Sequence, residues 1–313
     1  MKCYLCRSEN LKVVRTKLRH DISRNVLECQ DCGLNFLEPK NKDLKEYYQQ
    51  DYRQLYTPVI GKKLSSKETF EMYLPQQQIH LDQLKDILKP EMKVLDVGCS
   101  SGHFLYSIKD KVKEVTGIEF NKDDAEFVNK ELGIKVYSQP IAETDLPQQH
   151  FDLITAFQVL EHVQDPINFL VDLKKYLKPD GYICLEVPNV CDALLYLYQI
   201  EPYAAFWFRE PHLFNFSPKT LGLVLEKAGF KGKMQTVQRY NFVNHLNWVL
   251  TGQPQKSADV GMGQSNLKLA DNVNKDIKEE LQAWLGKVDQ EYKDLLNKHQ
   301  LGDSILFIGQ KNK

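Results

Sequence analysis

The stretch "VLDVGCSSGHFL", residues 94–105, decides the fold of this chain. Its apolar start predicts a buried strand that ends close to an acid, Asp96, and the glycines that follow predict a tight turn into a helix. Glycine lets the backbone approach a ligand closely, and the N–H groups at the start of the helix then face that ligand. Gly98 and Gly102 therefore predict a ligand-binding loop, with a plain strand-to-helix turn as the alternative.

A second acid strengthens the ligand-binding interpretation. The segment "EVTGIEF", residues 114–120, predicts the next strand, and Glu119 lies at its end. An acid at that place and spacing accepts hydrogen bonds from ribose hydroxyls. The glycines follow the pattern GxxxG and not GxGxxG, and no phosphate-binding lysine motif is present, which argues against a nucleotide phosphate. The pattern predicts a cofactor that contains a nucleoside, bound at the carboxyl ends of the strands.

Strand-like and helix-like segments alternate from the loop onward, which predicts a doubly wound α/β sheet. Three later motifs follow in order: "FDLITAFQVLEHVQDP" (151–166), "LKPDGYICLEVPN" (177–189) and "EPHLFNFSPKTLGLVLEKAGF" (210–230). Together with the glycine loop, they resemble the motifs of class I S-adenosylmethionine-dependent methyltransferases. The resemblance covers about residues 90–240 and returns at "DSILFIGQK" (303–311). It implies a Rossmann-like, seven-stranded sheet, S-adenosylmethionine as cofactor and a methyl-transferring enzyme.

The resemblance also implies the residues that hold the cofactor. Glu119 would hold the ribose, Phe120 would stack on the adenine, and Gln158 would lie beside the methionine or the sulfonium. The full implied set is Asp96, Gly98, Cys99, Gly102, Glu119, Phe120, Ile141, Ala142 and Gln158. Many family members carry an acid after the third strand, where this chain has Gln139-Pro140, so the contact to the adenine amino group has no assigned residue.

Methyl transfer from a sulfonium is a direct displacement, so alignment of donor and acceptor does most of the work. A hydroxyl acceptor must also lose its proton, which suits a histidine near neutral pKa. Glu161 and His162 follow the fourth strand, and His212 belongs to a segment expected to cover the site. His162 is either the base or a residue that packs and hydrogen-bonds the loop. His212 is favoured as a residue that fixes the covering segment.

Two CxxC pairs near the start predict a small metal-binding module over residues 1–40. Cys3 with Cys6 and Cys29 with Cys32 can complete a shell of four sulfur ligands around zinc. A closed shell of this kind has no position for substrate, so the zinc is expected to be structural. Forty residues bury little core, so the metal should supply much of the folding free energy.

Residues 41–90 have helical and polar composition and predict a helical linker that covers the site. Residues 91–240 form the predicted cofactor-binding core, residues 241–302 a helical insertion or lid, and residues 303–313 the final strand of the core. An apolar stripe at helical spacing runs through the insertion: Ile277, Leu281, Trp284, Leu285, Val288, Tyr292 and Leu295. Such a stripe is typical of a core or of a dimer face, so a homodimer through this helix is one expectation.

Composition narrows the partners. Lys and Arg number 41 against 42 Asp and Glu, which gives a net charge of −1. RNA-binding proteins usually have a broad basic surface, and this composition does not favour one. We expect no nucleic-acid partner, no membrane span and no signal peptide, and the cysteines suggest a reducing compartment, the cytoplasm.

Three functions fit these observations. The zinc module together with "NHLNWVLTGQP" (244–254) is similar to methyltransferases of bacterial surface-glycan and sugar biosynthesis. This favours a methyltransferase that acts on a sugar, a nucleotide-linked sugar or another polar metabolite, most simply on oxygen. The alternatives are an RNA methyltransferase that uses the zinc module to bind RNA, and a noncatalytic partner subunit that keeps the fold.

Overall fold

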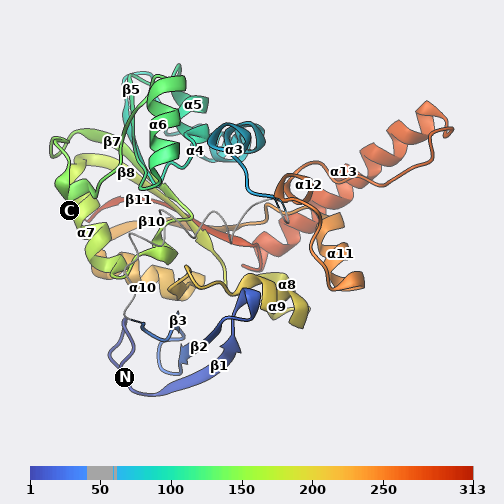
Figure 1. Cartoon of the computed structure of the whole chain (residues 1–313), viewed down its shortest axis with the longest axis horizontal. Helices are drawn as coiled ribbons and strands as arrows, with labels where there is room; N and C mark the ends of the chain where they lie inside the picture. Colours follow the sequence, from blue (N-terminus) through green and yellow to red (C-terminus); the bar gives the residue numbers. More distant parts are fainter. Residues whose placement is uncertain (41–58, 60–61, 313) are drawn as a thin grey trace.

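A computed structural model of the chain describes residues 1–40, 59 and 62–312. A seven-stranded sheet lies at its centre, in the order β10-β11-β8-β7-β4-β5-β6 (Figure 1). Neighbouring strands from β8 to β6 run parallel, whereas β11 is antiparallel to both of its neighbours. The strands are β4 (Lys93–Val97), β5 (Glu114–Ile118), β6 (Lys135–Tyr137), β7 (Phe151–Phe157), β8 (Leu177–Pro188), β10 (Phe230–Val237) and β11 (Ser304–Lys311). The predicted Rossmann-like sheet of seven strands is confirmed.

Helices cover both faces of this sheet (Figure 1). On one face lie α4 (Gln78–Leu84), α5 (His103–Ile108) and α6 (Lys122–Glu131), and on the other α7 (Pro166–Tyr176) and α10 (Pro218–Ala228). The caps of α7 and α10 follow from local sequence, because the side chains of Asp165 and Ser217 accept hydrogen bonds from the third backbone N–H of each helix. Proline follows each cap, where its fixed φ angle suits the first helical position.

A second, four-stranded sheet joins the amino-terminal residues to the main domain. Its strands are β1 (Leu11–Lys17), β2 (Ser23–Cys29), β3 (Asn35–Leu37) and β9 (Phe214–Asn215), antiparallel and in that order. Strand β9 comes from the segment "EPHLFNF" of the main domain, which the sequence analysis did not predict as a strand. The amino-terminal residues therefore share a sheet with the main domain.

The same joint also has a common hydrophobic core. Leu27, Leu34 and Phe36 from the amino-terminal sheet belong to one buried cluster with Phe216 and Leu221 of the main domain. The sequence analysis expects a bound metal to supply much of the folding free energy of the amino-terminal residues. This shared core adds a second source of stability that the sequence did not reveal.

Further helices and short turns lie outside the central sheet and the helices that cover it. They are α3 (Ser66–Tyr73), α8 (Ala193–Tyr196), α9 (Glu201–Trp207), α11 (Phe242–Thr251), α12 (Ala258–Met262) and α13 (Lys275–Lys298), with the short turns η1 (Arg19–Asp21), η2 (Leu74–Gln77), η3 (Ile141–Glu143) and η4 (Leu160–His162). The predicted linker over residues 41–90 falls partly on residues 41–58 and 60–61, which lie outside the described residues. The domain boundaries stay predictions.

Helix α13 extends away from the rest of the molecule (Figure 1). Its apolar stripe divides, because Leu285 is buried whereas Ile277 and Trp284 are 51% and 55% exposed. The predicted homodimer through this helix stays a prediction. Within the described part of the chain, no helix is both long enough and apolar enough to cross a bilayer.

The shared core predicts that the two sheets unfold together. Phe36 is 4% exposed within that core, so Phe36→Ala is expected to lower the free energy of unfolding of the whole chain by about 3–5 kcal/mol. Val13→Ala is the matched control, because Val13 is 47% exposed on β1 and its loss should cost less than about 0.5 kcal/mol. Urea unfolding followed by circular dichroism and by tryptophan fluorescence would test this. A separate early transition of the amino-terminal residues in Phe36→Ala, with an unchanged main transition, would contradict it.

Candidate functional site

The glycine loop adopts the conformation that its sequence predicts. Gly98 and Gly102 have φ angles of +75° and +77°, which L-residues with side chains rarely adopt. The space around both glycines is also closed: an added Cβ at Gly98 would lie 2.5 Å from Cγ2 of Val159, and one at Gly102 would lie 2.8 Å from Cγ2 of Val128. The loop thus requires glycine at both positions.

Glu119 holds this loop from the neighbouring strand. One oxygen of its carboxylate accepts a hydrogen bond from the backbone N–H of Ser100 at 2.8 Å. The other accepts one from the backbone N–H of Asn121 at 2.7 Å. The carboxylate is therefore fixed at the end of β5 and faces the turn between β4 and α5. A rigid acceptor of this kind suits a ribose, because its position is set before the ligand binds.

Asp96 braces the loop from below. It is 3% exposed, and its Oδ1 accepts a hydrogen bond of 2.6 Å from the Thr155 hydroxyl on β7. Burial, together with the negative charge of Glu119, raises the pKa of Asp96 to about 7, although the bond from Thr155 acts in the opposite direction. The residue thus links strands β4 and β7 beneath the turn.

A large cavity of about 1210 Å³ opens at the carboxyl ends of the strands, beside this loop. Its walls include Phe120, half-exposed after β5, and Ile141 and Ala142 of η3. All predicted cofactor-binding and catalytic residues line this cavity except Gly102, which lies behind the loop against Val128. The structure thus brings the predicted site residues together, and their individual roles stay predictions.

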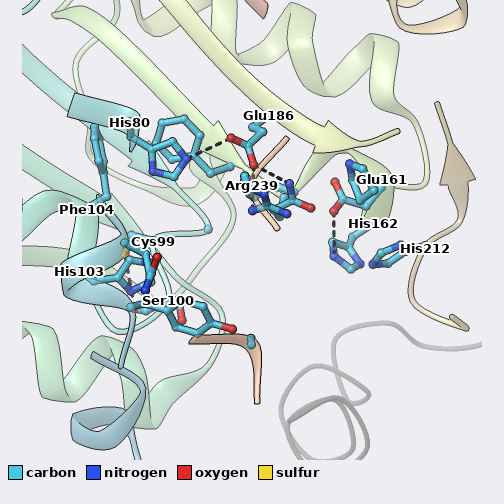
Figure 2. A pocket seen from close by; sticks show the side chains of 18 of the residues that line it. His80, Cys99, Ser100, His103, Phe104, Glu161, His162, Glu186, His212 and Arg239 are labelled. Atoms are coloured by element: carbon cyan, nitrogen blue, oxygen red, sulfur yellow. Dashed lines mark hydrogen bonds and ion pairs between the residues drawn. The ribbon is translucent and has the colours of Figure 1, made fainter. Parts of the chain in front are cut away.

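Gln158 lies at the end of β7 and leads to a charged network that the sequence analysis missed. Its Nε2 donates to Oε1 of Glu186 at 2.9 Å. Glu186 is fully buried at the end of β8 and also contacts Nη1 of Arg239 at 3.0 Å and Nε2 of His80 at 3.2 Å (Figure 2). Burial opposes the charged form, but Arg239 and His80 hold the pKa of Glu186 at about 2. The sequence signal that could have identified Glu186 is the same as for Glu119, namely an acid at the end of an apolar strand.

The predicted catalytic residues form a second cluster in the cavity. Figure 2 shows Glu161, His162 and His212 close together, apart from Cys99 and Ser100 of the glycine loop and with Glu186 and Arg239 between the two groups. One potential metal-binding atom from each of Glu161, His162 and His212 lies within 4.8 Å of the others. His212 comes from the covering segment just before β9, and the structure places it against the ring of His162, with ring centres 4.9 Å apart.

Burial controls the charge of this cluster. It raises the pKa of Glu161 to about 8 and lowers the pKa of His162 to about 4. Burial and the nearby guanidinium of Arg209 also hold the pKa of His212 well below its usual value. Without a bound partner, the three groups are therefore largely uncharged near pH 7.

The four amino-terminal cysteines also come together, as predicted. Sγ of Cys3 lies 3.6 Å from Sγ of Cys32, and Sγ of Cys6 lies 3.4 Å from Sγ of Cys29. Gly33 has a φ angle of +86° and its N–H donates to the carbonyl of Cys29, so the turn after the second pair favours glycine. The cluster is a group of thiols that could hold a metal ion.

A family model described as "Methyltransferase domain" matches residues 73–233, about half of the chain. The chain belongs to this methyltransferase family. The match includes the glycine loop, Glu119 and the Glu161–His162 pair, and the predicted enzyme class is confirmed at the level of the domain. The covering segment that carries His212 lies inside the same range.

Curated relatives of this methyltransferase chain are similar over part of their length. A tRNA U34 carboxymethyltransferase of Hydrogenovibrio crunogenus is 31% identical over 54% of this chain and 54% of the relative. A ubiquinone biosynthesis O-methyltransferase of Haemophilus ducreyi is 34% identical over 31% of this chain and 45% of the relative. The chain thus spans about half the length of these curated relatives.

Among solved structures, a SAM-dependent methyltransferase from Archaeoglobus fulgidus has the same fold. The TM-score is 0.51 and the identity 19%, over 78% of this chain and 97% of that structure. At this identity the likeness concerns the fold alone. The three relatives described above are not named for a sugar acceptor. The sugar acceptor favoured by the sequence analysis therefore stays a prediction.

The glycine loop predicts a specific effect of substitution. Gly98→Ala adds a Cβ both at a strained φ angle and against Val159, so it should displace the loop and weaken binding of S-adenosylhomocysteine at least about tenfold. Gly133→Ala is the matched control, because Gly133 has a φ angle of +65° but no atom within 4 Å of an added Cβ. Isothermal titration of both variants would test this. Equal affinities of Gly98→Ala and Gly133→Ala would show that the close approach to Val159 is unimportant.

Proposed function

We propose that this chain transfers a methyl group from S-adenosylmethionine to a hydroxyl of a sugar, a nucleotide-linked sugar or a related polar metabolite. The observation that carries the proposal is the single cavity that contains both the glycine loop with Glu119 and the cluster of Glu161, His162 and His212. One end of the cavity thus suits a nucleoside, and the other end presents polar groups to an acceptor.

The donor end fits S-adenosylmethionine on the geometry of this chain. The glycine loop leaves no space for side chains, and the fixed carboxylate of Glu119 faces the position expected for a ribose. Phe120 and Ile141 provide apolar surfaces on which an adenine ring can pack. The ion pair of Glu186 with Arg239 lies between the loop and the acceptor cluster.

When bound, S-adenosylmethionine supplies a methyl group on a sulfonium, and its transfer to a hydroxyl forms a carbon–oxygen bond, leaves the electrons of the broken bond on sulfur and releases the hydroxyl proton. The residues of this chain align the acceptor and assist removal of that proton. We propose that the acceptor hydroxyl binds beside Glu161, His162 and His212, because this cluster lies across the cavity from the glycine loop.

The walls near this cluster suit a polar acceptor of moderate size. Tyr203, Phe206 and Trp207 line the cavity, and sugars pack well on aromatic rings. Arg209 lies in the same wall and can bind a phosphate or carboxylate of the acceptor. The similarity to an O-methyltransferase supports oxygen as the methylated atom. The similarity to a tRNA-modifying enzyme favours RNA as the second candidate acceptor, and the net charge of −1 weighs against it.

We also propose that the four cysteines bind a structural zinc ion. Four thiolates about 2.3 Å from a tetrahedral zinc lie ~3.8 Å from one another. The sulfur separations of 3.6 Å and 3.4 Å in this chain are already close to that value. This zinc would hold the turn of Cys3 and Cys6 against the end of β2 and the turn between β2 and β3, and through β3 it would support β9 of the main domain.

The donor end is tested by Glu119→Gln. The amide cannot accept both of the hydrogen bonds from Ser100 and Asn121, so the variant should bind S-adenosylhomocysteine roughly 10- to 100-fold more weakly. Glu131→Gln, at the exposed end of α6, is the matched control and should bind like the wild type.

Transfer of labelled methyl groups to a panel of nucleotide-linked sugars and to bulk tRNA should then label the sugars. If tRNA is labelled and the sugars are not, RNA becomes the proposed acceptor. If the folded wild type does not bind S-adenosylhomocysteine, the enzyme proposal is overturned.

The zinc proposal is tested by Cys32→Ser. Serine is a poor zinc ligand, so the variant should lose about one zinc per chain and about 2 kcal/mol or more of stability. Atomic absorption on purified protein and urea unfolding measure the two effects. Cys191→Ser, outside the cluster, serves as the control. Zinc content that stays the same in Cys32→Ser would contradict the proposal.

A further inference from the structure

The cluster opposite the glycine loop has the composition of a metal site. Glu161 and His162 come from η4, directly after β7, and His212 comes from the covering segment before β9. Glu161 is 1% exposed and His212 is 4% exposed, so water around the protein does not solvate them. Their potential ligand atoms lie within 4.8 Å of one another and face the cavity (Figure 2).

Two of these side chains are buried without the hydrogen bonds that they need. Neither carboxylate oxygen of Glu161 has a hydrogen-bond partner within the described ranges, and the same holds for Nδ1 of His212. Buried polar atoms are almost always satisfied, and a buried carboxylate without a partner is costly. The guanidinium of Arg209 acts on Glu161 electrostatically but makes no hydrogen bond to it within the described ranges, so the proximity of these unsatisfied atoms favours a ligand that binds them directly.

The third side chain is oriented by a contact on its far side. Nδ1 of His162 lies 2.9 Å from the backbone carbonyl of Pro211. Because a carbonyl only accepts hydrogen bonds, Nδ1 carries the proton and Nε2 presents its lone pair. That nitrogen lies 3.6 Å from Oε1 of Glu161, which is beyond hydrogen-bond distance. A bond from Nδ1–H to a backbone carbonyl is the usual arrangement that orients a metal-binding histidine.

We propose that Glu161, His162 and His212 bind one divalent transition-metal cation. Two imidazole nitrogens and one carboxylate on one side of an ion would leave its other positions open, and all three residues line the cavity. The donor set suits Mn²⁺ or Zn²⁺ and differs from the four thiols at the amino terminus, which select softer ions.

The ion deepens the proposed function, and its role in methyl transfer rests on that function. An acceptor hydroxyl bound to a divalent cation loses its proton to water more readily, so neither histidine has to act as a base. The guanidinium of Arg209 acts electrostatically on Glu161 and on both histidines and so opposes a bare cation. An ionised acceptor oxygen offsets that charge, which favours binding of ion and acceptor together.

Titration with Mn²⁺ followed by electron paramagnetic resonance tests the site, because bound Mn²⁺ loses the sharp signal of the aqueous ion. The wild type, with its amino-terminal zinc site filled, should bind one Mn²⁺ per chain. Glu161→Gln and His212→Phe should weaken this binding at least about tenfold. His150→Phe is the matched control, because His150 is a partly buried histidine at the opposite end of β7 and should leave binding unchanged.

The result that overturns the proposal is absence of Mn²⁺ binding by the wild type, or binding that persists unchanged in both cluster variants. Titration of the same samples with S-adenosylhomocysteine shows that each variant is folded, and His212→Phe decides the question if Glu161→Gln does not fold. The same titration separates the two proposals. A chain that binds S-adenosylhomocysteine but not Mn²⁺ loses only the metal site, whereas one that binds Mn²⁺ but not S-adenosylhomocysteine loses the proposed methyl transfer.

Discussion

The pairing of β3 with β9 is the contact on which the arrangement of the acceptor end depends. Asn35 and Phe36 lie opposite Asn215 and Phe214, and the N–H of Leu37 donates to the carbonyl of Leu213 at 2.9 Å. Because His212 directly precedes this strand pair, the hydrogen bonds hold its backbone at the edge of the cavity. The amino-terminal sheet is thus part of the frame of the site, and the proposed zinc ion would act on the acceptor end through this sheet, without touching substrate.

The acidic side chains at the carboxyl ends of the strands differ in the partners that compensate their charge. Asp96, Glu119, Glu161 and Glu186 follow or end four strands of the same sheet, yet each has a different partner. Glu119 is satisfied by backbone N–H groups, and Glu186 is satisfied by Arg239 and His80. Glu161 is the member of this group whose carboxylate has no hydrogen bond within the part of the chain that the structure describes. This difference is the physical basis for the proposal that the cavity has a donor end beside Glu119 and an acceptor end, with a charged ligand, beside Glu161.

The covering segment connects these two ends to the rest of the fold. Arg209 and His212 face the cavity, and the chain continues through β9 into the core residue Phe216. Helix α9, just before this segment, adds Tyr203, Phe206 and Trp207 to the same wall. The family match covers this wall, but the curated relatives it resembles are named for chemically different acceptors. Acceptor choice in this chain is therefore expected to lie in these side chains and less in the glycine loop.

Local sequence determined the parts of this protein that depend on neighbours along the chain. The glycine loop needs positive φ angles at Gly98 and Gly102, the caps of α7 and α10 use residues three positions apart, and each CxxC pair lies within one turn, so all three were readable in advance. Glu119 was predicted because an acid at the end of the second strand, at that spacing from the glycines, suits the hydroxyls of a ribose. Tertiary structure alone decided the contacts between distant segments: β3 with β9, Glu186 with Arg239, and Glu161 with His212. Sequence spacing carries no information about such contacts, because they depend on how complete elements pack and on which buried charges must find partners.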